Sequence, residues 1–406
     1  MLDLPEFSDI QAAQKRLAGH IALTPCAKSQ TLSAMLGAEV FLKYENFQFT
    51  ASFKERGALN FLAANKEAHK DRLEKGVLAM SAGNHAQGLA YHAQRMGVSA
   101  TIVMPKFTPN TKVEATRVFG ADVHLHGETL EEARIYAEGL SQERDLLMVH
   151  PFNDFHVVAG QGTIGIEVLD AVENLDAIVV PIGGGGLIGG ISLAVKTLSP
   201  DTRVIGVQAE RFAGAYNDFN QVTPAKSPNR VTVAEGIAVK EPGTINKALI
   251  QRYVDEIHTV SESDIERSVF DLMEVEKVVA EGAGATPLAL LQKHPEKFQG
   301  QRVGVVISGG NIDMMVLSSI LQRGLVRSNR LTRINVEIPD NPGAMSAITA
   351  IVAEHESNIV DIQHQRAFSA SSARATVAEL VVQTRGSEQE QKLIQALEAA
   401  GFPAWT

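Results

Sequence analysis

Lys54 is a candidate nucleophile. It lies within Thr50–Ala58, which reads TASFKERGA. Ser52 and Glu55 have the S-x-x-E spacing of a capping box, so the stretch predicts the start of a helix with Lys54 in its first turn. The unpaired N–H groups and the positive end of the helix dipole disfavour a second positive charge there. A neutral lysine amine can form an imine with a carbonyl compound. A solvated lysine at an ordinary helix start fits the same pattern.

A loop of four glycines is a candidate phosphate site. It consists of Gly183, Gly184, Gly185 and Gly186, and it leads through Leu187 into a helical pattern. Consecutive N–H groups at a helix N-terminus bind anions, and a plain turn would need only one or two glycines.

The same loop permits another interpretation. It satisfies G-x-G-x-x-G, and Glu210 follows at roughly the 20-residue spacing of a ribose-binding acid, so a nicotinamide-dependent Rossmann oxidoreductase is an alternative. A P-loop is excluded because no Gly-Lys-Ser/Thr follows.

Two further polar junctions follow apolar runs. The junction at residues 81–85 could hold a carboxylate through its N–H groups, the Ser81 hydroxyl and the Asn84 carboxamide. The junction at residues 308–311 places Ser308 at the carboxyl end of a strand. Each could also be an ordinary cap or turn. Doubly wound sheets bind ligands at the carboxyl ends of their strands, so we expect both junctions to lie near Lys54. The first junction is Ser81, Ala82, Gly83, Asn84 and His85, and the second is Ser308, Gly309, Gly310 and Asn311.

Short apolar runs alternate with helical patterns through most of the chain, which predicts a doubly wound α/β sheet. The expected strands are 40–43, 76–80, 100–104, 122–125, 147–149, 177–182, 204–207 and 303–307. The expected helices are 9–18, 86–95, 111–118, 130–140 and 187–197.

The pattern changes after Gly324. Residues 325–330 are polar and basic and are predicted to form a linker. The order strand, helix, strand, strand, helix, with room for a last short strand, predicts an α+β domain of ferredoxin-like build over 331–406. Residues 1–324 would then form the catalytic part, in which a smaller subdomain at about 48–152 is inserted into a larger one.

The composition excludes several classes of function. With 37 basic and 47 acidic residues the net charge is −10, which gives no electrostatic case for binding nucleic acid or an anionic membrane. The single Cys26 excludes an intrachain disulfide framework and a cysteine metal cluster. No apolar stretch approaches the ~20 residues of a membrane span. We therefore expect a cytoplasmic protein whose partners are small molecules and copies of itself.

Taken together, the motifs closely resemble those of the fold-type II pyridoxal-phosphate enzymes, in that family's order. The resemblance covers about residues 24–321 and implies two open twisted-sheet domains of the tryptophan synthase β-like architecture. Its motifs are residues 52–58, 81–88, 159–163, 183–187, 281–285 and 308–311.

The resemblance also implies a cofactor, pyridoxal 5'-phosphate, and roles for residues. Lys54 would hold the cofactor as an imine, Phe53 would pack against its ring, and Asn84 would meet the ring hydroxyl. Ser308 would face the ring nitrogen. The residues from Gly183 to Leu187 would bind the phosphate, and those from Ser81 to His85 the substrate carboxylate.

Within this family the chain resembles the threonine ammonia-lyases (threonine dehydratases). This implies β-elimination of L-threonine, and also of L-serine, to 2-oxobutanoate or pyruvate plus ammonia. Ser308, unlike an aspartate, cannot keep the ring nitrogen charged, which favours elimination over transamination. With no lysine or arginine in the glycine loop, the cofactor phosphate can keep a proton for the leaving hydroxyl. Serine racemase, a β-replacing synthase, the oxidoreductase above and an amino-acid-sensing module remain alternatives.

The tail resembles an ACT regulatory domain. This implies a small effector, such as isoleucine or valine, bound between paired domains of a homodimer or homotetramer. The expected effector residues are Asp340, Asn341, Gly343, Asn358 and Ile359.

The chain departs from the family pattern at two places. Ala51 stands where many members have glycine before Ser-Phe-Lys. Gln208, Ala209 and Glu210 stand where serine racemases carry an acidic cation ligand, so we expect no metal.

Overall fold

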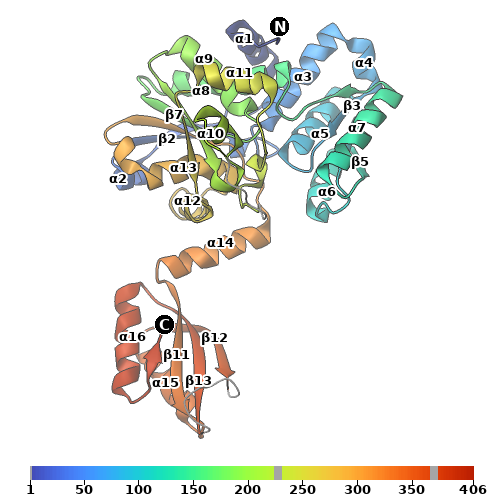
Figure 1. The fold of residues 1–406 in the computed structure, drawn as a ribbon. Helices are drawn as coiled ribbons and strands as arrows, with labels where there is room; N and C mark the ends of the chain where they lie inside the picture. Colours follow the sequence, from blue (N-terminus) through green and yellow to red (C-terminus); the bar gives the residue numbers. More distant parts are fainter. Residues whose placement is uncertain (1, 224–230, 366–373) are drawn as a thin grey trace. The chain divides into compact units, whose positions relative to one another are not determined.

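The computed structural model describes residues 2–223, 231–365 and 374–406 (Figure 1). The chain divides into an N-terminal unit, Met1–Ile312, and a C-terminal unit, Asp313–Thr406. None of the helices in these described ranges combines the length and apolarity needed to cross a membrane.

A six-stranded sheet forms the centre of the N-terminal unit, in the order β1-β2-β10-β7-β8-β9. All neighbours run parallel except β1, which is antiparallel to β2. Strands covered on both faces are apolar along their whole length, and this produced the continuous apolar runs of the sequence. The strands are Cys26–Ser29 (β1), Glu39–Tyr44 (β2), Arg302–Ile307 (β10), Ala177–Pro181 (β7), Arg203–Ala209 (β8) and Glu256–Val260 (β9).

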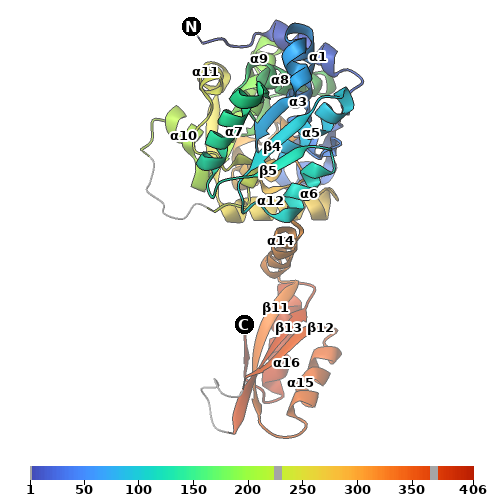
Figure 2. The same ribbon diagram turned by 90° about the vertical axis from the view of Figure 1, so that its right-hand side faces the viewer.

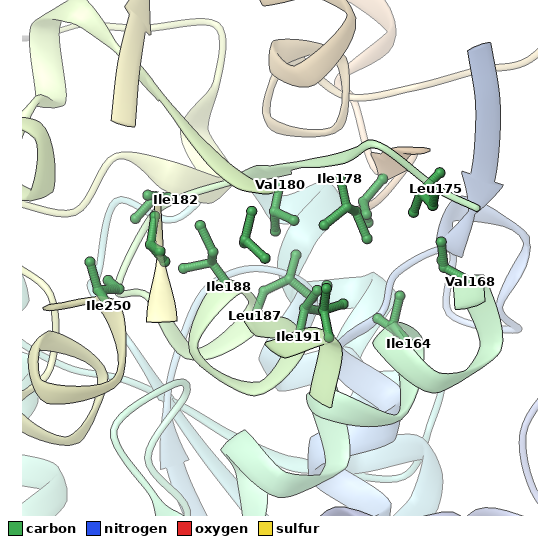
Figure 3. Close-up of a cluster of buried hydrophobic side chains, with 14 of the residues drawn as sticks. Ile164, Val168, Leu175, Ile178, Val180, Ile182, Leu187, Ile188, Ile191 and Ile250 are labelled. Atoms are coloured by element: carbon green, nitrogen blue, oxygen red, sulfur yellow. The ribbon is translucent and has the colours of Figure 1, made fainter. Parts of the chain in front are cut away.

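Helices cover this sheet with branched aliphatic side chains. Figure 3 shows Ile178, Val180 and Ile182 of the β7 segment facing Ile188 and Ile191 of α9. This packing fixes both the strand and the helix that flank the four-glycine loop. The longer helices around this sheet are Phe7–Leu17 (α1), Phe155–Ala171 (α8), Gly186–Leu198 (α9), Thr244–Tyr253 (α11), Glu262–Val275 (α12) and Gly282–Lys293 (α13).

A second, four-stranded sheet has the order β5-β4-β3-β6 and is parallel throughout. Its two faces are covered by different helices, α7 on one face and α3 with α5 on the other, as Figure 2 shows for α7 and α5. Its strands are Val77–Met80 (β3), Ala100–Met104 (β4), Asp122–Leu125 (β5) and Leu147–Met148 (β6). Its helices are Lys54–Ala68 (α3), Lys70–Lys75 (α4), Asn84–Met96 (α5), Asn110–Arg117 (α6) and Leu130–Arg144 (α7).

The C-terminal unit contains an antiparallel sheet in the order β12-β13-β11-β14, with α15 and α16 packed on it. Along the chain the order is βαββαβ, the ferredoxin-like order expected from the sequence. The elements are Met314–Arg327 (α14), Leu331–Pro339 (β11), Ala344–Glu354 (α15), Asn358–Gln365 (β12), Ala375–Gln383 (β13), Ser387–Ala399 (α16) and Ala404–Trp405 (β14).

The predicted α/β fold with a small α+β unit is confirmed, with two differences in detail. Helix α14 continues to Arg327, so part of the segment expected to be a linker is helical. Several elements had no counterpart among the expected ones, such as β1, β9 and α8, because each carries polar residues or glycines that interrupt its apolar pattern. The remaining short helices are Gln30–Leu36 (α2), Glu45–Phe47 (η1), Glu210–Phe212 (η2), Gly214–Phe219 (α10), Glu235–Ile237 (η3) and Pro295–Lys297 (η4).

Candidate active site

Lys54 is the first residue of α3 and its side chain is partly buried. Its Nζ donates a 2.6 Å hydrogen bond to the carbonyl oxygen of Pro151. Burial lowers the pKa of Lys54 to about 8, against the opposing charge of Glu281. The amine is therefore neutral at lower pH than an ordinary lysine, as imine formation requires. The pKa of Lys54 is lowered, as we expected, but the largest cause is burial rather than the helix terminus.

The capping box expected at this helix start is wrong. The Ser52 hydroxyl accepts a 3.3 Å hydrogen bond from the nitrogen of Lys54, two residues on rather than three. The Glu55 carboxylate accepts from the nitrogen of Thr50, not from that of Ser52, and its second oxygen lies 3.3 Å from His92 Nε2. Residues 50–53 thus form a tight loop, in which Ala51 has a left-handed φ of 54°.

Main-chain contacts join this loop to the junction after β10. The nitrogen of Phe53 donates to the carbonyl oxygen of Ser308 at 3.1 Å, and Gly310 donates to Ala51 at 2.9 Å. Ser52 and Gly309 form an antiparallel bridge between these hydrogen bonds. The structure therefore holds Ser308, which is 2% exposed, beside the main chain that carries Lys54.

The four-glycine loop follows β7 and opens α9. A Cβ on Gly184 would lie 2.2 Å from the ring of Phe152, and one on Gly186 would lie 2.9 Å from the Phe152 carbonyl oxygen. Gly185 has a φ of +87°, which favours glycine. The first N–H groups of α9 have no acceptor within the helix, so they are available to an anion.

Phe152 connects the glycine loop to the lysine. It follows Pro151, whose carbonyl oxygen accepts from Lys54. The Asn246 amide donates to the carbonyl oxygens of both Phe152, at 2.9 Å, and Gly184, at 2.7 Å. Lys54 and the glycine loop therefore both contact the segment Pro151–Phe152.

The junction from Ser81 to His85 joins β3 to α5, which begins at Asn84. A Cβ on Gly88 of α5 would lie within 3.3 Å of main-chain atoms of Lys54 and Glu55, so this helix packs directly against the start of α3. A Cβ on Gly83 would meet no atom within 4 Å, so the junction borders open space next to the lysine.

His85 points away from that space into the protein. Its ring is 2% exposed and its Nε2 lies 3.1 Å from the carbonyl oxygen of Val149. Burial, with the nearby charge of Lys54, lowers the pKa of His85 to about 3. The ring is therefore neutral at physiological pH, and His85 could contribute to a carboxylate site through its main chain rather than its side chain.

Glu281 is the residue of this site that had no role in the sequence interpretation. Its Oε1 accepts a 2.8 Å hydrogen bond from Asn84 Nδ2, and its nitrogen donates to Gly309 at 3.0 Å. Burial raises the pKa of Glu281 to about 7. Only its place in the motif of residues 281–285 could have pointed to it.

A buried charge cluster supports the first turns of α3. Arg56 makes two hydrogen bonds to Glu45, both of 2.7 Å, and two to Glu167, of 2.6 and 2.8 Å. Lys43 lies 2.6 Å from Glu167 as well. The cluster pairs two cations with two carboxylates, and it anchors the helix two residues beyond Lys54.

In the C-terminal unit, the residues predicted to bind an effector form two groups. Asp340, Asn341 and Gly343 follow β11, whereas Asn358 and Ile359 begin β12. The pairing of β13 places Asn358 beside Gln383 and Pro339 beside Ala375, at opposite ends of that strand. The groups are therefore about 25 Å apart along the sheet. One chain alone does not bring them together.

The pKa of the Lys54 amine is lowered, and the N–H groups that follow the nearby glycine loop are available to an anion. This pair of features suits a cofactor that carries both an aldehyde and a phosphate. Residues 17–309 match the family model described as pyridoxal-phosphate dependent enzyme. The chain belongs to this family, and its cofactor is pyridoxal 5'-phosphate.

Several relatives of the chain are lyases named for threonine. It is 41% identical over 394 residues to L-threonine ammonia-lyase of Thermotoga maritima, a match that covers 97% of both chains. Among solved structures it is similar to threonine deaminase isoform 2 of Solanum lycopersicum, at 33% identity with a TM-score of 0.72, over 78% of this chain and 86% of that one. It is also similar to serine racemase of Dictyostelium discoideum, at 32% identity with a TM-score of 0.70, over 76% and 99%.

The family match leaves the oxidoreductase alternative without support. Glu210, which that alternative assigned to a ribose, is paired with Lys293 at 3.1 Å. At the position where an acidic cation ligand was considered, the Gln208 amide donates to Ile182 at 3.2 Å and accepts from Tyr216 at 2.9 Å.

Proposed function

We propose that the protein is a threonine ammonia-lyase that converts L-threonine to 2-oxobutanoate and ammonia, and L-serine to pyruvate and ammonia. The observation that carries this proposal is the 41% identity to the Thermotoga maritima L-threonine ammonia-lyase, because it extends over 97% of the chain, including the C-terminal unit. The site supplies the groups that such an elimination needs.

The cofactor, when bound, withdraws electrons from the substrate and so makes its α-C–H bond acidic. Lys54 is the residue that would hold the cofactor. Once replaced by the substrate amine, the Lys54 amine, whose pKa is about 8, would be free to accept the α-proton. The carbonyl oxygen of Pro151 accepts a hydrogen bond from that amine and so restricts its position.

Two sets of main-chain N–H groups hold the negative charges of the ligands. The start of α9, at Gly183 to Leu187, would hold the phosphate, and the start of α5, at Ser81 to His85, would hold the substrate carboxylate. Phe53 would pack against the cofactor ring, Asn84 would bind its hydroxyl and Ser308 would bind its nitrogen. The only basic residue of α9 is Lys196, which binds Pro200, Thr202 and Asp255 near the other end of the helix.

The C-terminal unit serves as an ACT-type regulatory domain. Its βαββαβ order and the separation of the two expected effector groups support a site shared between two copies of the chain. The protein would then be a homodimer or homotetramer in the cytoplasm, and a small amino acid such as isoleucine or valine would be its effector.

The decisive experiment combines an absorbance spectrum with product analysis. The purified protein should be yellow, and L-threonine should give equal amounts of 2-oxobutanoate and ammonia. Lys54→Ala should lose the absorbance of the bound cofactor and about 10²- to 10⁴-fold of turnover. A colourless protein that is nevertheless active would contradict the proposal.

Serine racemase is the second candidate, favoured by the likeness to the Dictyostelium discoideum structure. Incubation with L-serine separates the two, because a racemase produces D-serine without ammonia.

A further inference from the structure

The carboxamide of Asn84 is held at both of its polar atoms. Nδ2 donates to Glu281 Oε1 at 2.8 Å, and Oδ1 accepts from Asn311 Nδ2, also at 2.8 Å. Asn311 Nδ2 also donates to the carbonyl oxygen of Thr50 at 2.8 Å, so both of its N–H groups are used.

These contacts determine the orientation of the Asn84 amide from two sides. The carbonyl oxygen of Thr50 can only accept, so Asn311 must present its nitrogen, and Asn84 must answer with its oxygen. Above its raised pKa of about 7 the Glu281 carboxylate can only accept, so Asn84 presents its nitrogen there, in agreement with the 2.8 Å contact from Nδ2. The constraints agree, and they leave one N–H of Asn84 unassigned.

Glu281 itself has little freedom to move. Its nitrogen donates to the carbonyl oxygen of Gly309, and a Cβ on Gly309 would lie 2.6 Å from Glu281 Oε1. A Cβ on Gly236 would lie 3.2 Å from the same oxygen. Its carboxylate therefore fits closely between two glycines and Asn84.

We propose that Glu281 is a positioning residue: together with Asn311 it fixes Asn84 so that an N–H, and not an oxygen, is offered to the ring oxygen of the cofactor. The inference rests on the role of Asn84 in the proposed function. If the Asn84 amide were flipped, its oxygen would face the ring oxygen of the cofactor. Two acceptors would then oppose each other, and binding of the cofactor would be weaker.

A double-mutant cycle in the full-length protein tests this inference. Apoprotein of the wild type, Glu281→Ala, Asn84→Ala and the double variant is titrated with pyridoxal 5'-phosphate, and affinity and absorbance maximum are measured without substrate. We expect Glu281→Ala to weaken binding about tenfold and to shift the maximum, and to have no further effect once Asn84 is alanine. Glu281→Gln, which keeps an acceptor oxygen, should restore most of the affinity.

Two results would overturn the inference: an unchanged affinity and spectrum in Glu281→Ala, or losses in the two single variants that multiply in the double one. Asn311→Ala provides a second route if Glu281→Ala does not fold, because its loss should also vanish in the Asn84→Ala background. Glu276→Ala is the matched control, since this neighbouring glutamate accepts from Ser29 and Tyr44 and should leave affinity unchanged. The measurements need no substrate, so absence of threonine turnover would count against the proposed function alone.

Discussion

The nitrogen of Phe53 donates a 3.1 Å hydrogen bond to the carbonyl oxygen of Ser308. The residue before the reactive lysine and the residue assigned to the ring nitrogen are thus joined through the main chain, although 255 positions separate them in the printed sequence. Side-chain substitutions here can change the chemistry without separating the two loops.

Covalent uptake of the cofactor should depend on pH through Lys54. Only the neutral amine reacts, and its fraction rises as pH passes upward through the lowered pKa of about 8. The rate at which apoprotein acquires the absorbance of the bound cofactor should therefore be half-maximal near pH 8 and level off about one pH unit above. The amine of N-acetyl-lysine amide is the control, and a midpoint for the protein near its ordinary value of 10.5 would contradict burial as the activating factor.

Gly184→Ala should abolish tight cofactor binding. The new Cβ would lie 2.2 Å from the Phe152 ring, so either the glycine loop or Phe152 must move. We expect a destabilisation of about 1–3 kcal/mol and a large loss of affinity for pyridoxal 5'-phosphate. Urea unfolding and cofactor titration measure the two effects. Gly139→Ala in α7 is the control, because its Cβ meets nothing within 4 Å and should stabilise by about 0.5–1 kcal/mol.

Arg56→Met should destabilise the protein by about 3–5 kcal/mol, because it leaves the carboxylates of Glu45 and Glu167 without their main partner. The free energy of unfolding from urea titration is the measurement. Arg134→Met removes an exposed arginine with two glutamate partners and should leave the free energy of unfolding nearly unchanged, because solvent screens such pairs. Equal effects of the two variants would show that the buried cluster does not anchor α3.

Ala51→Gly should raise stability by up to about 1 kcal/mol, because the φ of 54° strains any residue with a Cβ. The absorbance of the bound cofactor should not change. Ala18→Gly is the comparison, since Ala18 has a φ of −56° and glycine there only adds freedom to the unfolded chain. Thermal unfolding in the presence of cofactor distinguishes the two variants. A midpoint for Ala51→Gly below that of the wild type would count against strain at this turn.

Removal of residues 331–406 should leave threonine turnover and end any response to an amino-acid effector. The N-terminal unit contains every residue assigned to cofactor and substrate, which is the basis for this expectation. Turnover is measured with and without isoleucine or valine, for the full chain and the shortened one. A response that survives the deletion would place the effector site in the N-terminal unit.

Most of the buried parallel strands could be predicted because their signals are local. Strands such as β4 and β7 are buried on both faces and read as apolar runs, and the glycine loop directly follows β7. Helix α15, Ala344–Glu354, begins directly after Asp-Asn-Pro-Gly, which is a local turn signal of the same kind.

The partners of Glu55 and Glu281 were not predictable because long-range contacts decide them. The path of residues 50–53 depends on the bridge to Gly309, and this path turns Glu55 toward Thr50. Glu281 meets Asn84 across 197 positions of the chain, and no local pattern specifies that contact.

Asn311 lies close in the chain to the start of the C-terminal unit. It holds Asn84 and Thr50, and only Ile312 stands between it and Asp313, whose carboxylate caps α14 at Met315 and Val316. The N-terminal unit therefore ends one residue after a side chain that orients the Asn84 amide, and the C-terminal unit begins with the residue that caps α14.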